Sequence, residues 1–409
     1  MFKDLALTSR SSGRFLGAGS PDAPRVRQTR PMVVLTLASL LGTGASAATL
    51  ATATQDSLRL TLPPALYAVP GVPMSVYHDN MVLTETPEAY RFEVACDIGK
   101  SEAGRWTVTP SGKDAGDHPM DVTVEDALGR ELARAKTVLR VVRRDAGNGR
   151  GLRLLIIGDS LTAATTYPNE IARLLSEPGN PKWTMLGTHR PPSARAGVAH
   201  EGYGGWTWAS FLSRYDPKHG HALDEAGKRH SSPFVYPVAD GQPVLDIARY
   251  IRENCEDQSP DVVTILLGIN DCFSVNPDDA KAIDARIDKV MGDAERFLKA
   301  FRAASSRAVF AIGLTTPPNS RESGFEANYK GKYHRWGWKR IQHRIVMRML
   351  EQFAGRESDG IQIVPTELNL DPTDGYPDNN GVHPNATGYR QIGASFYCWI
   401  KWWLQTTQP

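Results

Sequence analysis

The sequence predicts an α/β domain built on a parallel sheet, preceded by a small all-β sandwich domain. Three observations predict this arrangement. From residue 152 onward, short apolar runs alternate with longer segments of helical spacing, which is typical of parallel strands joined by helices. Between residues 56 and 143, short runs alternate apolar and polar side chains, as antiparallel strands do. A polar, glycine-rich stretch at residues 146–151 separates the two patterns and is predicted to be a linker.

The first 47 residues are predicted to be a leader with a signal peptide. Residues 32–41 form a short, mostly apolar run, with three arginines before it and the small-x-small triplet Ala45–Ala47 after it. This combination is typical of secretory signals. The run is too short to span a membrane, which takes roughly 20 apolar residues. We therefore expect a secreted or periplasmic protein without stable membrane insertion. The alternative is a disordered N-terminal arm. Because 31 residues are long for the basic region of a signal, either translation begins at Met32 or the leader is extended.

The bulk composition is that of an ordinary soluble globular protein. The 409 residues are 41% hydrophobic and 22% charged, with a formal net charge of +2. Such a small net charge gives no strong positive field, so we expect no nucleic-acid partner. Four cysteines are too few for a disulfide scaffold. We expect either a single Cys255–Cys272 bridge or four buried thiols.

The predicted strands of the N-terminal domain, residues 48–145, are short alternating runs. Examples are Leu58–Leu62, Tyr90–Val94 and Thr137–Val141. Turns that contain Pro or Gly separate such runs, and several strands in about ninety residues favour a β-sandwich. We expect this domain to be a structural cap on the catalytic domain, with carbohydrate binding as the alternative.

The second domain, residues 152–409, is predicted to contain strands buried on both faces, because their apolar runs are nearly continuous. The predicted strands are residues 152–157, 262–267, 308–314 and 361–364, and the predicted helices are residues 167–175, 283–303, 336–353 and 389–404.

Ser160 lies in the first of four short blocks that are suited to acyl transfer. It follows Gly158 and Asp159 where the first buried strand ends and a helix should begin. Open α/β sheets place their reactive groups at such strand ends. A serine hydroxyl needs an adjacent base to act as a nucleophile. Gly-Asp-Ser alone is also common in turns and helix caps.

The other three blocks supply a possible base and possible oxyanion donors. Gly205 lies in a glycine-rich segment whose backbone N–H groups can approach a substrate oxygen. Asn270 follows the second buried strand, and its amide can donate to a developing oxyanion. His383 precedes the last predicted helix, and the fold can bring it beside a distant serine. Each block taken singly is equally well explained as a turn or a structural residue.

Taken in order, the four blocks resemble those of the SGNH (GDSL) hydrolases, a family of esterases and lipases, over residues 152–405. The resemblance implies a three-layer α/β/α domain similar to flavodoxin. It implies Ser160 as nucleophile, His383 as base, and an oxyanion hole made by the Ser160 and Gly205 N–H groups and the Asn270 side chain. The implied reaction is ester hydrolysis through an acyl-enzyme, with no metal or organic cofactor.

One position departs from the family pattern. The family usually has Asp three residues before the catalytic His, where this chain has Asn380. An amide oxygen can orient the His383 imidazole but brings no negative charge. Asp374 or Asp378 could replace it, or the enzyme could be impaired. We expect Asn380 to act as a catalytic residue that supports His383.

The substrate prediction depends on the segment around Gly205. Tyr203, Trp206 and Trp208 would stack on sugar rings if exposed, or belong to the core if buried. The segment at residues 200–207 also resembles that of SGNH enzymes acting on carbohydrate esters, some of which carry an N-terminal β-sandwich. We therefore expect a carbohydrate O-acetylesterase of undetermined oligomeric state. The alternatives are a short-chain esterase or lysophospholipase-like hydrolase, and an impaired scaffold that binds carbohydrate.

Overall fold

The computed structural model describes residues 58–407 except residues 226 and 240. The predicted leader and signal peptide therefore lie outside the described residues. Within this part of the chain, no helix combines the length and the apolar character needed to cross a membrane.

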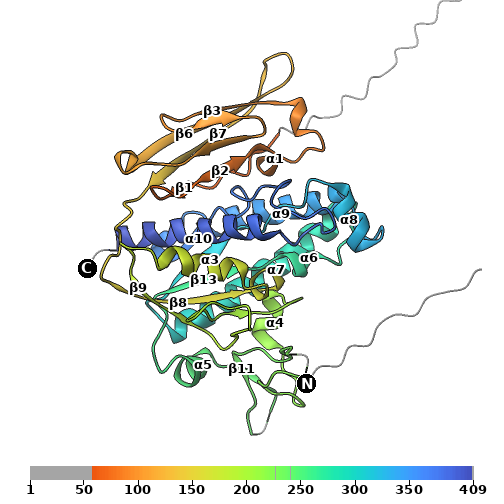
Figure 1. Cartoon of the computed structure of the whole chain (residues 1–409). Helices are drawn as coiled ribbons and strands as arrows, with labels where there is room; N and C mark the ends of the chain where they lie inside the picture. The colour runs from red at the N-terminus through yellow and green to blue at the C-terminus, as the bar shows by residue number, and fades with distance from the viewer. Residues whose placement is uncertain (1–57, 226, 240, 408–409) are drawn as a thin grey trace, which may run out of the picture. The chain divides into compact units, whose positions relative to one another are not determined.

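A parallel sheet forms the centre of the C-terminal part of the chain. Its strand order is β10-β8-β13-β14-β15, with β9 also paired to β8 (Figure 1). The strands are β8 (Gly151–Gly158), β9 (Lys182–Leu186), β10 (Glu201–Gly202), β13 (Val262–Leu266), β14 (Val309–Gly313) and β15 (Ile361–Val364). Every pairing is parallel. The central strands are almost entirely buried, as strands covered on both faces are. The predicted parallel sheet is confirmed.

Helices from both ends of this region cover the sheet. They are α2 (Ser160–Ala163), α3 (Thr166–Leu175), α4 (Trp208–Ser213), α5 (Ile247–Asn254), α6 (Ile269–Cys272), α7 (Ala280–Ala304), α8 (Glu322–Tyr329), α9 (Arg335–Phe353) and α10 (Ala386–Thr406). Helix α10 packs on α3, while α7 contacts α4, α5 and α9. The four predicted helices correspond to α3, α7, α9 and α10, each to within three residues. A small antiparallel pair, β11 (Val235–Tyr236) and β12 (Val244–Leu245), lies between α4 and α5.

The N-terminal part of the described chain forms two sheets that share an apolar core. One has the order β1-β7-β6-β3 and the other β2-β5-β4. The elements are β1 (Ala65–Ala68), β2 (Met74–Tyr77), α1 (His78–Met81), β3 (Arg91–Ala95), β4 (Lys100–Glu102), β5 (Arg105–Val108), β6 (Gly116–Glu125) and β7 (Glu131–Val141). That this part is a separate domain stays a prediction.

The prediction of a strand at Leu58–Leu62 is wrong, because this segment joins neither sheet. Its alternating side chains still pack on the core of the N-terminal sheets. The backbone N–H of Thr61 donates to the Met81 carbonyl (2.9 Å), and the Thr61 hydroxyl donates to the Asn80 carbonyl (3.1 Å). The segment is therefore held by the end of helix α1 rather than by a strand ladder.

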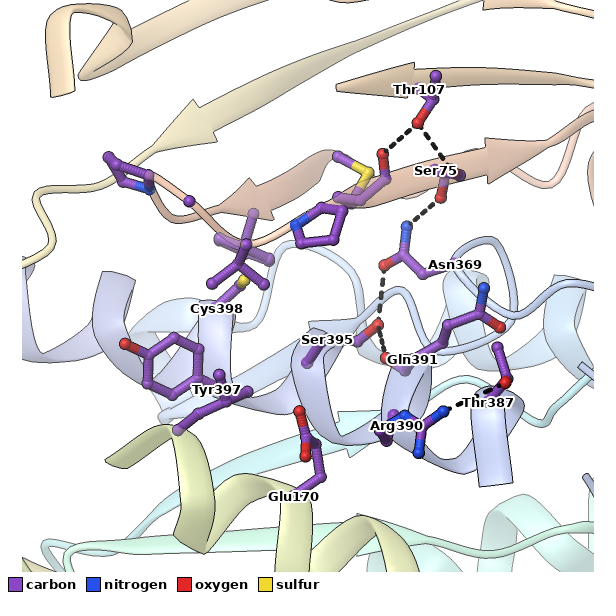
Figure 2. Close-up of a pocket in the computed structure, with 18 of the residues that line it drawn as sticks. Ser75, Thr107, Glu170, Asn369, Thr387, Arg390, Gln391, Ser395, Tyr397 and Cys398 are labelled. Atoms are coloured by element: carbon purple, nitrogen blue, oxygen red, sulfur yellow. Dashed lines mark hydrogen bonds between the residues drawn. The ribbon is translucent and has the colours of Figure 1, made fainter. Parts of the chain in front are cut away.

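A chain of hydrogen bonds joins the N-terminal sheets to helix α10 (Figure 2). The Ser75 hydroxyl donates to the Thr107 hydroxyl (2.9 Å), and Asn369 Nδ2 donates to the Ser75 carbonyl (2.8 Å). The Ser395 hydroxyl, on α10, donates to Asn369 Oδ1 (3.0 Å). A cavity of about 620 Å³, lined by residues of β2, α3 and α10, opens beside these hydrogen bonds. We call this line of contacts, formed by Ser75, Thr107, Asn369 and Ser395, the seam. Its polar groups provide hydrogen-bond partners for one another.

The glycine-rich stretch predicted as a linker is a turn held against helix α10. Lys401 Nζ, on that helix, donates to the Ala146 carbonyl (2.5 Å) and to the Gly179 carbonyl (3.0 Å). Ala146 is buried, and strand β8 already begins at Gly151. These contacts fix the chain where the N-terminal sheets meet the parallel sheet.

The four cysteines are free thiols, so the predicted Cys255–Cys272 bridge is wrong. Cys255, Cys272 and Cys398 are buried, whereas Cys96 is half-buried, so the buried-thiol alternative holds for three of the four. Cys255 directly follows helix α5, and Cys272 is the last residue of helix α6, and both pack into the core. Burial raises the pKa of both thiols to about 12.

Candidate active site

Ser160 opens helix α2 directly after strand β8. The Asp159 carboxylate caps this helix by accepting a hydrogen bond from the Leu161 N–H (2.9 Å). Gly158 permits the tight turn, because a Cβ there would lie 2.0 Å from Thr162 Oγ1. The strand-to-helix turn thus leaves the Ser160 side chain half-buried at the carboxyl edge of the sheet.

His383 comes to Ser160 from a position 223 residues further along the chain. It lies in the loop before α10, and its Nε2 is 2.8 Å from Ser160 Oγ. Burial lowers the pKa of His383 below its usual 6.5. The imidazole is therefore mostly neutral at pH 7, which is the form that can accept the serine proton.

Asn380 closes the turn that carries His383. Its Oδ1 accepts hydrogen bonds from the backbone N–H groups of Val382 (3.1 Å) and His383 (2.9 Å). The same oxygen lies 3.2 Å from His383 Nδ1. A proton on Nδ1 that points to this oxygen leaves the Nε2 lone pair facing Ser160, which is the tautomer a general base requires.

Asp374 and Asp378 face a different partner. Asp374 Oδ1 lies 3.6 Å from Arg321 Nη2, and Asp378 Oδ1 lies 3.6 Å from Arg321 Nε. Their side chains are 82% and 88% exposed. Asn380, rather than either aspartate, therefore occupies the position beside the His383 imidazole.

Asn319 holds the loop that carries Asn380, and sequence reasoning missed it. This fully buried side chain donates from Nδ2 to the Pro377 carbonyl (2.9 Å) and the Asn380 carbonyl (3.0 Å). Its backbone N–H donates to the Gly381 carbonyl (2.9 Å). The only signal in the sequence is its place shortly after the third buried strand, at the edge where Ser160 and Asn270 also follow strands.

Three candidate oxyanion donors lie near one another. Ser160 N–H is at the first position of α2, where helix geometry leaves N–H groups without an intrahelical partner. Gly205 has φ +78°, a conformation that favours glycine. No hydrogen bond within the described chain engages either N–H. Asn270 Nδ2 donates to the Trp206 carbonyl (3.1 Å) and to Asp159 Oδ2 (3.3 Å), so it bridges the glycine-rich and serine blocks.

Two buried carboxyl groups flank Asn270. Burial raises the pKa of Asp159 and of Asp271 to about 7. Asp271 Oδ1 accepts a hydrogen bond from the Trp208 N–H (3.1 Å), which fixes the start of α4. Near neutral pH a fraction of each carboxyl is protonated, which reduces the negative charge beside a developing oxyanion.

The aromatic side chains near Gly205 belong to the core. Tyr203, Trp206 and Trp208 are only 4%, 1% and 2% exposed. The Trp206 ring packs between those of Tyr203 (centroids 4.6 Å apart) and Phe211 (5.0 Å). The prediction that these rings stack on sugar is therefore wrong, because the turn directs them inward; the core alternative is confirmed.

Comparisons with known proteins place this geometry in context. A family model described as GDSL-like Lipase/Acylhydrolase matches residues 154–396. Among solved structures, a carbohydrate esterase family 3 enzyme from Talaromyces cellulolyticus is 16% identical, with a TM-score of 0.38 and coverage of 63% of this chain and 100% of its own. A Clostridium thermocellum family 3 carbohydrate esterase is 18% identical (TM-score 0.37; 63% and 98%). A carbohydrate acetylesterase from Sinorhizobium meliloti is 13% identical (TM-score 0.36; 61% and 98%). A search of curated proteins gives no significant match.

Proposed function

The chain belongs to the GDSL-like lipase/acylhydrolase family and is a carboxylic ester hydrolase, and on that premise we propose that it is an exported serine esterase that removes short acyl groups, above all acetyl, from carbohydrate. The observation that carries the proposal is the 2.8 Å contact between His383 Nε2 and Ser160 Oγ, with Asn380 Oδ1 facing the other ring nitrogen. A nucleophile, a base and an orienting group in hydrogen-bond reach are the parts that acyl transfer needs.

In the first half of the reaction, Ser160 Oγ attacks the ester carbonyl carbon while its proton passes to His383 Nε2. The carbonyl oxygen becomes an oxyanion, which accepts hydrogen bonds from the Ser160 and Gly205 N–H groups and from Asn270 Nδ2. Because both amide hydrogens of Asn270 already have protein acceptors, the oxyanion shares or displaces one of them. The imidazolium then protonates the departing alkoxide oxygen, which leaves as the alcohol.

In the second half, His383 takes a proton from water, and the hydroxide attacks the acyl carbon of the ester on Ser160. Collapse of the second tetrahedral intermediate releases the carboxylic acid and returns the proton to Ser160 Oγ. Asn380 orients the imidazole in both halves through its amide oxygen. It brings no negative charge to the imidazolium, so catalysis relies more heavily on the oxyanion donors.

We propose a short acyl group for the ester that Ser160 attacks. The cavities of about 620 Å³ and 1040 Å³ are lined by neither Ser160 nor His383. Neither cavity therefore gives the nucleophile a tunnel for a long acyl chain, and this favours acetyl esters over long-chain lipids.

A carbohydrate leaving group is supported by the larger of these cavities. It is lined by polar and charged side chains of the kind that bind sugar hydroxyls, by the half-buried Tyr90 and Phe92, and by residues 371–374. That segment is tied to the start of α10, because Asn385 Nδ2 donates to the Asp374 carbonyl (2.8 Å). A sugar chain that occupies the cavity would thus contact the loop that leads to His383.

The test is acetate release from p-nitrophenyl acetate and from acetylated xylan by the wild type and by Ser160→Ala. Ser213→Ala is the matched control, since this exposed hydroxyl bonds only to the Ala209 carbonyl of its own helix. We expect the wild type and Ser213→Ala to release acetate from both substrates and Ser160→Ala to release none.

Release from p-nitrophenyl acetate alone would overturn the carbohydrate part of the proposal and favour a general short-chain esterase. Activity on lysophosphatidylcholine above that on acetylated xylan would favour a lysophospholipase-like hydrolase. Retained turnover in Ser160→Ala would remove Ser160 as the nucleophile, and no turnover in the wild type would favour a scaffold that binds without cutting.

A further inference from the structure

The loop between α4 and β11 (Figure 1) carries a cluster of acidic and imidazole side chains. One side-chain atom each from Asp216, His219 and His230 lies within 4.8 Å of the other two. These three side chains are 35%, 26% and 22% exposed, so they are shielded but open to solvent. Imidazole nitrogen and carboxylate oxygen within such a distance are the donor set of a zinc site.

Each imidazole has a carboxylate on one ring nitrogen. His219 Nδ1 lies 2.8 Å from Asp216 Oδ2, and His230 Nε2 lies 2.7 Å from Asp224 Oδ2. The first contact joins two of the candidate ligands, so a metal held between them would replace this hydrogen bond. At His230 the Asp224 carboxylate can accept the Nε2–H, which leaves Nδ1 to bind a metal, the usual support of a metal-bound histidine. The contact with Asp224 supports His230 in this way.

The charges of the cluster favour a dication. The rings of His219 and His230 stack with centroids 4.4 Å apart and an interplanar angle of 21°. The Asp216 carboxylate gives the cluster a negative charge that a dication bound there would contact directly.

We propose that Asp216, His219 and His230 bind a divalent transition-metal ion, Zn²⁺ by the chemistry of the donor set, with Asp224 orienting His230. Solvent completes the coordination, since three protein ligands leave at least one position open. The ion ties together the two ends of the loop, because Asp216 lies near its start and His230 near its end.

The site would stabilise one wall of the region around Gly205. The Arg214 guanidinium lies 5.3 Å from the centroid of the Trp206 ring, and Arg229 lies 5.4 Å from that of Tyr203. Both arginines belong to the metal-bearing loop. A metal that orders this loop therefore supports the aromatic cluster beneath Gly205 without touching the reacting atoms. The proposal is independent of the substrate assigned above.

The experiment uses the full chain purified without a polyhistidine tag, stripped with a chelator and dialysed. Zinc is then titrated by calorimetry, and melting temperatures are measured with and without it. We expect one zinc per chain, a melting temperature that rises by a few degrees at about a hundredfold excess over Kd, and reversal by chelator. Binding of less than about a tenth of an equivalent, with no shift in melting temperature, would overturn the proposal.

Variants separate a built site from adventitious binding. His219→Ala and His230→Ala should each weaken zinc affinity by at least about tenfold. His118→Ala is the control, because His118 Nδ1 also faces a carboxylate (Asp97 Oδ1, 2.7 Å) but has no second imidazole. Affinity that is unchanged in the His219→Ala/His230→Ala double variant would show adventitious zinc only. The wild-type titration decides the matter even if that variant fails to fold.

Discussion

Two turns of this molecule place a side-chain oxygen three residues before a histidine and aim it at the ring Nδ1. In the candidate active site the oxygen is Asn380 Oδ1, 3.2 Å from His383; in the α4–β11 loop it is Asp216 Oδ2, 2.8 Å from His219. The second turn has the Asp-x-x-His spacing usual for the family, yet it is His383 that faces Ser160. The three-residue spacing therefore specifies the geometry of the turn. Whether the histidine can act as a base for a serine depends instead on the group that faces its Nε2.

The partners of the two imidazoles also differ in charge. Burial lowers the pKa of His383 and so favours the unprotonated ring, and the neutral oxygen of Asn380 adds no charge that would raise this pKa. The carboxylate of Asp216 adds a negative charge beside His219, which suits a cation. The same local fold thus prepares one histidine to take a proton from serine and the other to bind a positive ion.

The largest expected effect separates the two histidines directly. His383→Ala should lower kcat/KM for p-nitrophenyl acetate by about 10⁴-fold or more, because the base is lost. His219→Ala should lower it at most a few-fold, since its ring faces no nucleophile. His118→Ala serves as the unchanged control. A His383→Ala enzyme with more than a tenth of the wild-type rate would contradict the assignment of the base.

The next effect concerns Asn270, whose amide bonds to the Trp206 carbonyl and to the carboxylate of Asp159, the neighbour of Ser160. Asn270→Ala should lower kcat by about 10²–10³-fold with little change in KM, because its amide acts on charge that develops in the transition state. Steady-state kinetics measure the split. Asn169→Ala, whose amide bonds only to loop backbone groups of Ser193 and Arg195, is the control. An effect on KM alone would place Asn270 in substrate binding instead.

A smaller effect is expected from the support of the active-site turn. Asn319→Ala should lower kcat by about tenfold, because the loop with Asn380 loses two hydrogen bonds, and should destabilise the fold by about 1–3 kcal/mol. Asn369→Ala is a matched control: it is also a buried amide, but it joins the N-terminal sheets to α10. Equal losses of activity in the two variants at equal stability would refute a positioning role for Asn319.

The smallest effect tests the difference in charge itself. Asn380→Asp should leave kcat equal or raise it, by at most about tenfold, while the acid limb of the pH–rate profile moves to higher pH by about one unit. The sign follows because a carboxylate stabilises the imidazolium and so raises the pKa of His383, which burial holds below 6.5 in the wild type. A tenfold fall in kcat would instead show that the amide nitrogen of Asn380 has a role.

Elements with strong local periodicity could be predicted from the sequence. The buried strand before Ser160 and the amphipathic helix α7 follow from side-chain patterns within a few turns of chain. The strand ends then place Ser160 and Asn270 at one edge of the sheet, because parallel strands end on the same side. That His383 joins them followed from resemblance rather than from any local pattern.

Features set by irregular loops could not be predicted. Trp206 points inward because a turn at Gly205 with positive φ reverses the chain, and the sequence does not fix that direction. Asn319 acts through carbonyl groups some sixty residues away, with no periodicity to reveal it. The approach of His230 to Asp216 likewise depends on how the loop between them folds.

The seam of Figure 2 has a consequence for the order in which the protein is made. Ser75 and Thr107 are synthesised early. Asn369, which bonds to Ser75, and Ser395, which bonds to Asn369, come near the end of the chain. At about 5–20 residues per second, the N-terminal sheets wait on the order of tens of seconds before helix α10 can cover them. During that interval the face of the sheets that helix α10 will contact is accessible to chaperones and proteases. This exposure ends when helix α10 has been synthesised and packs on the sheets.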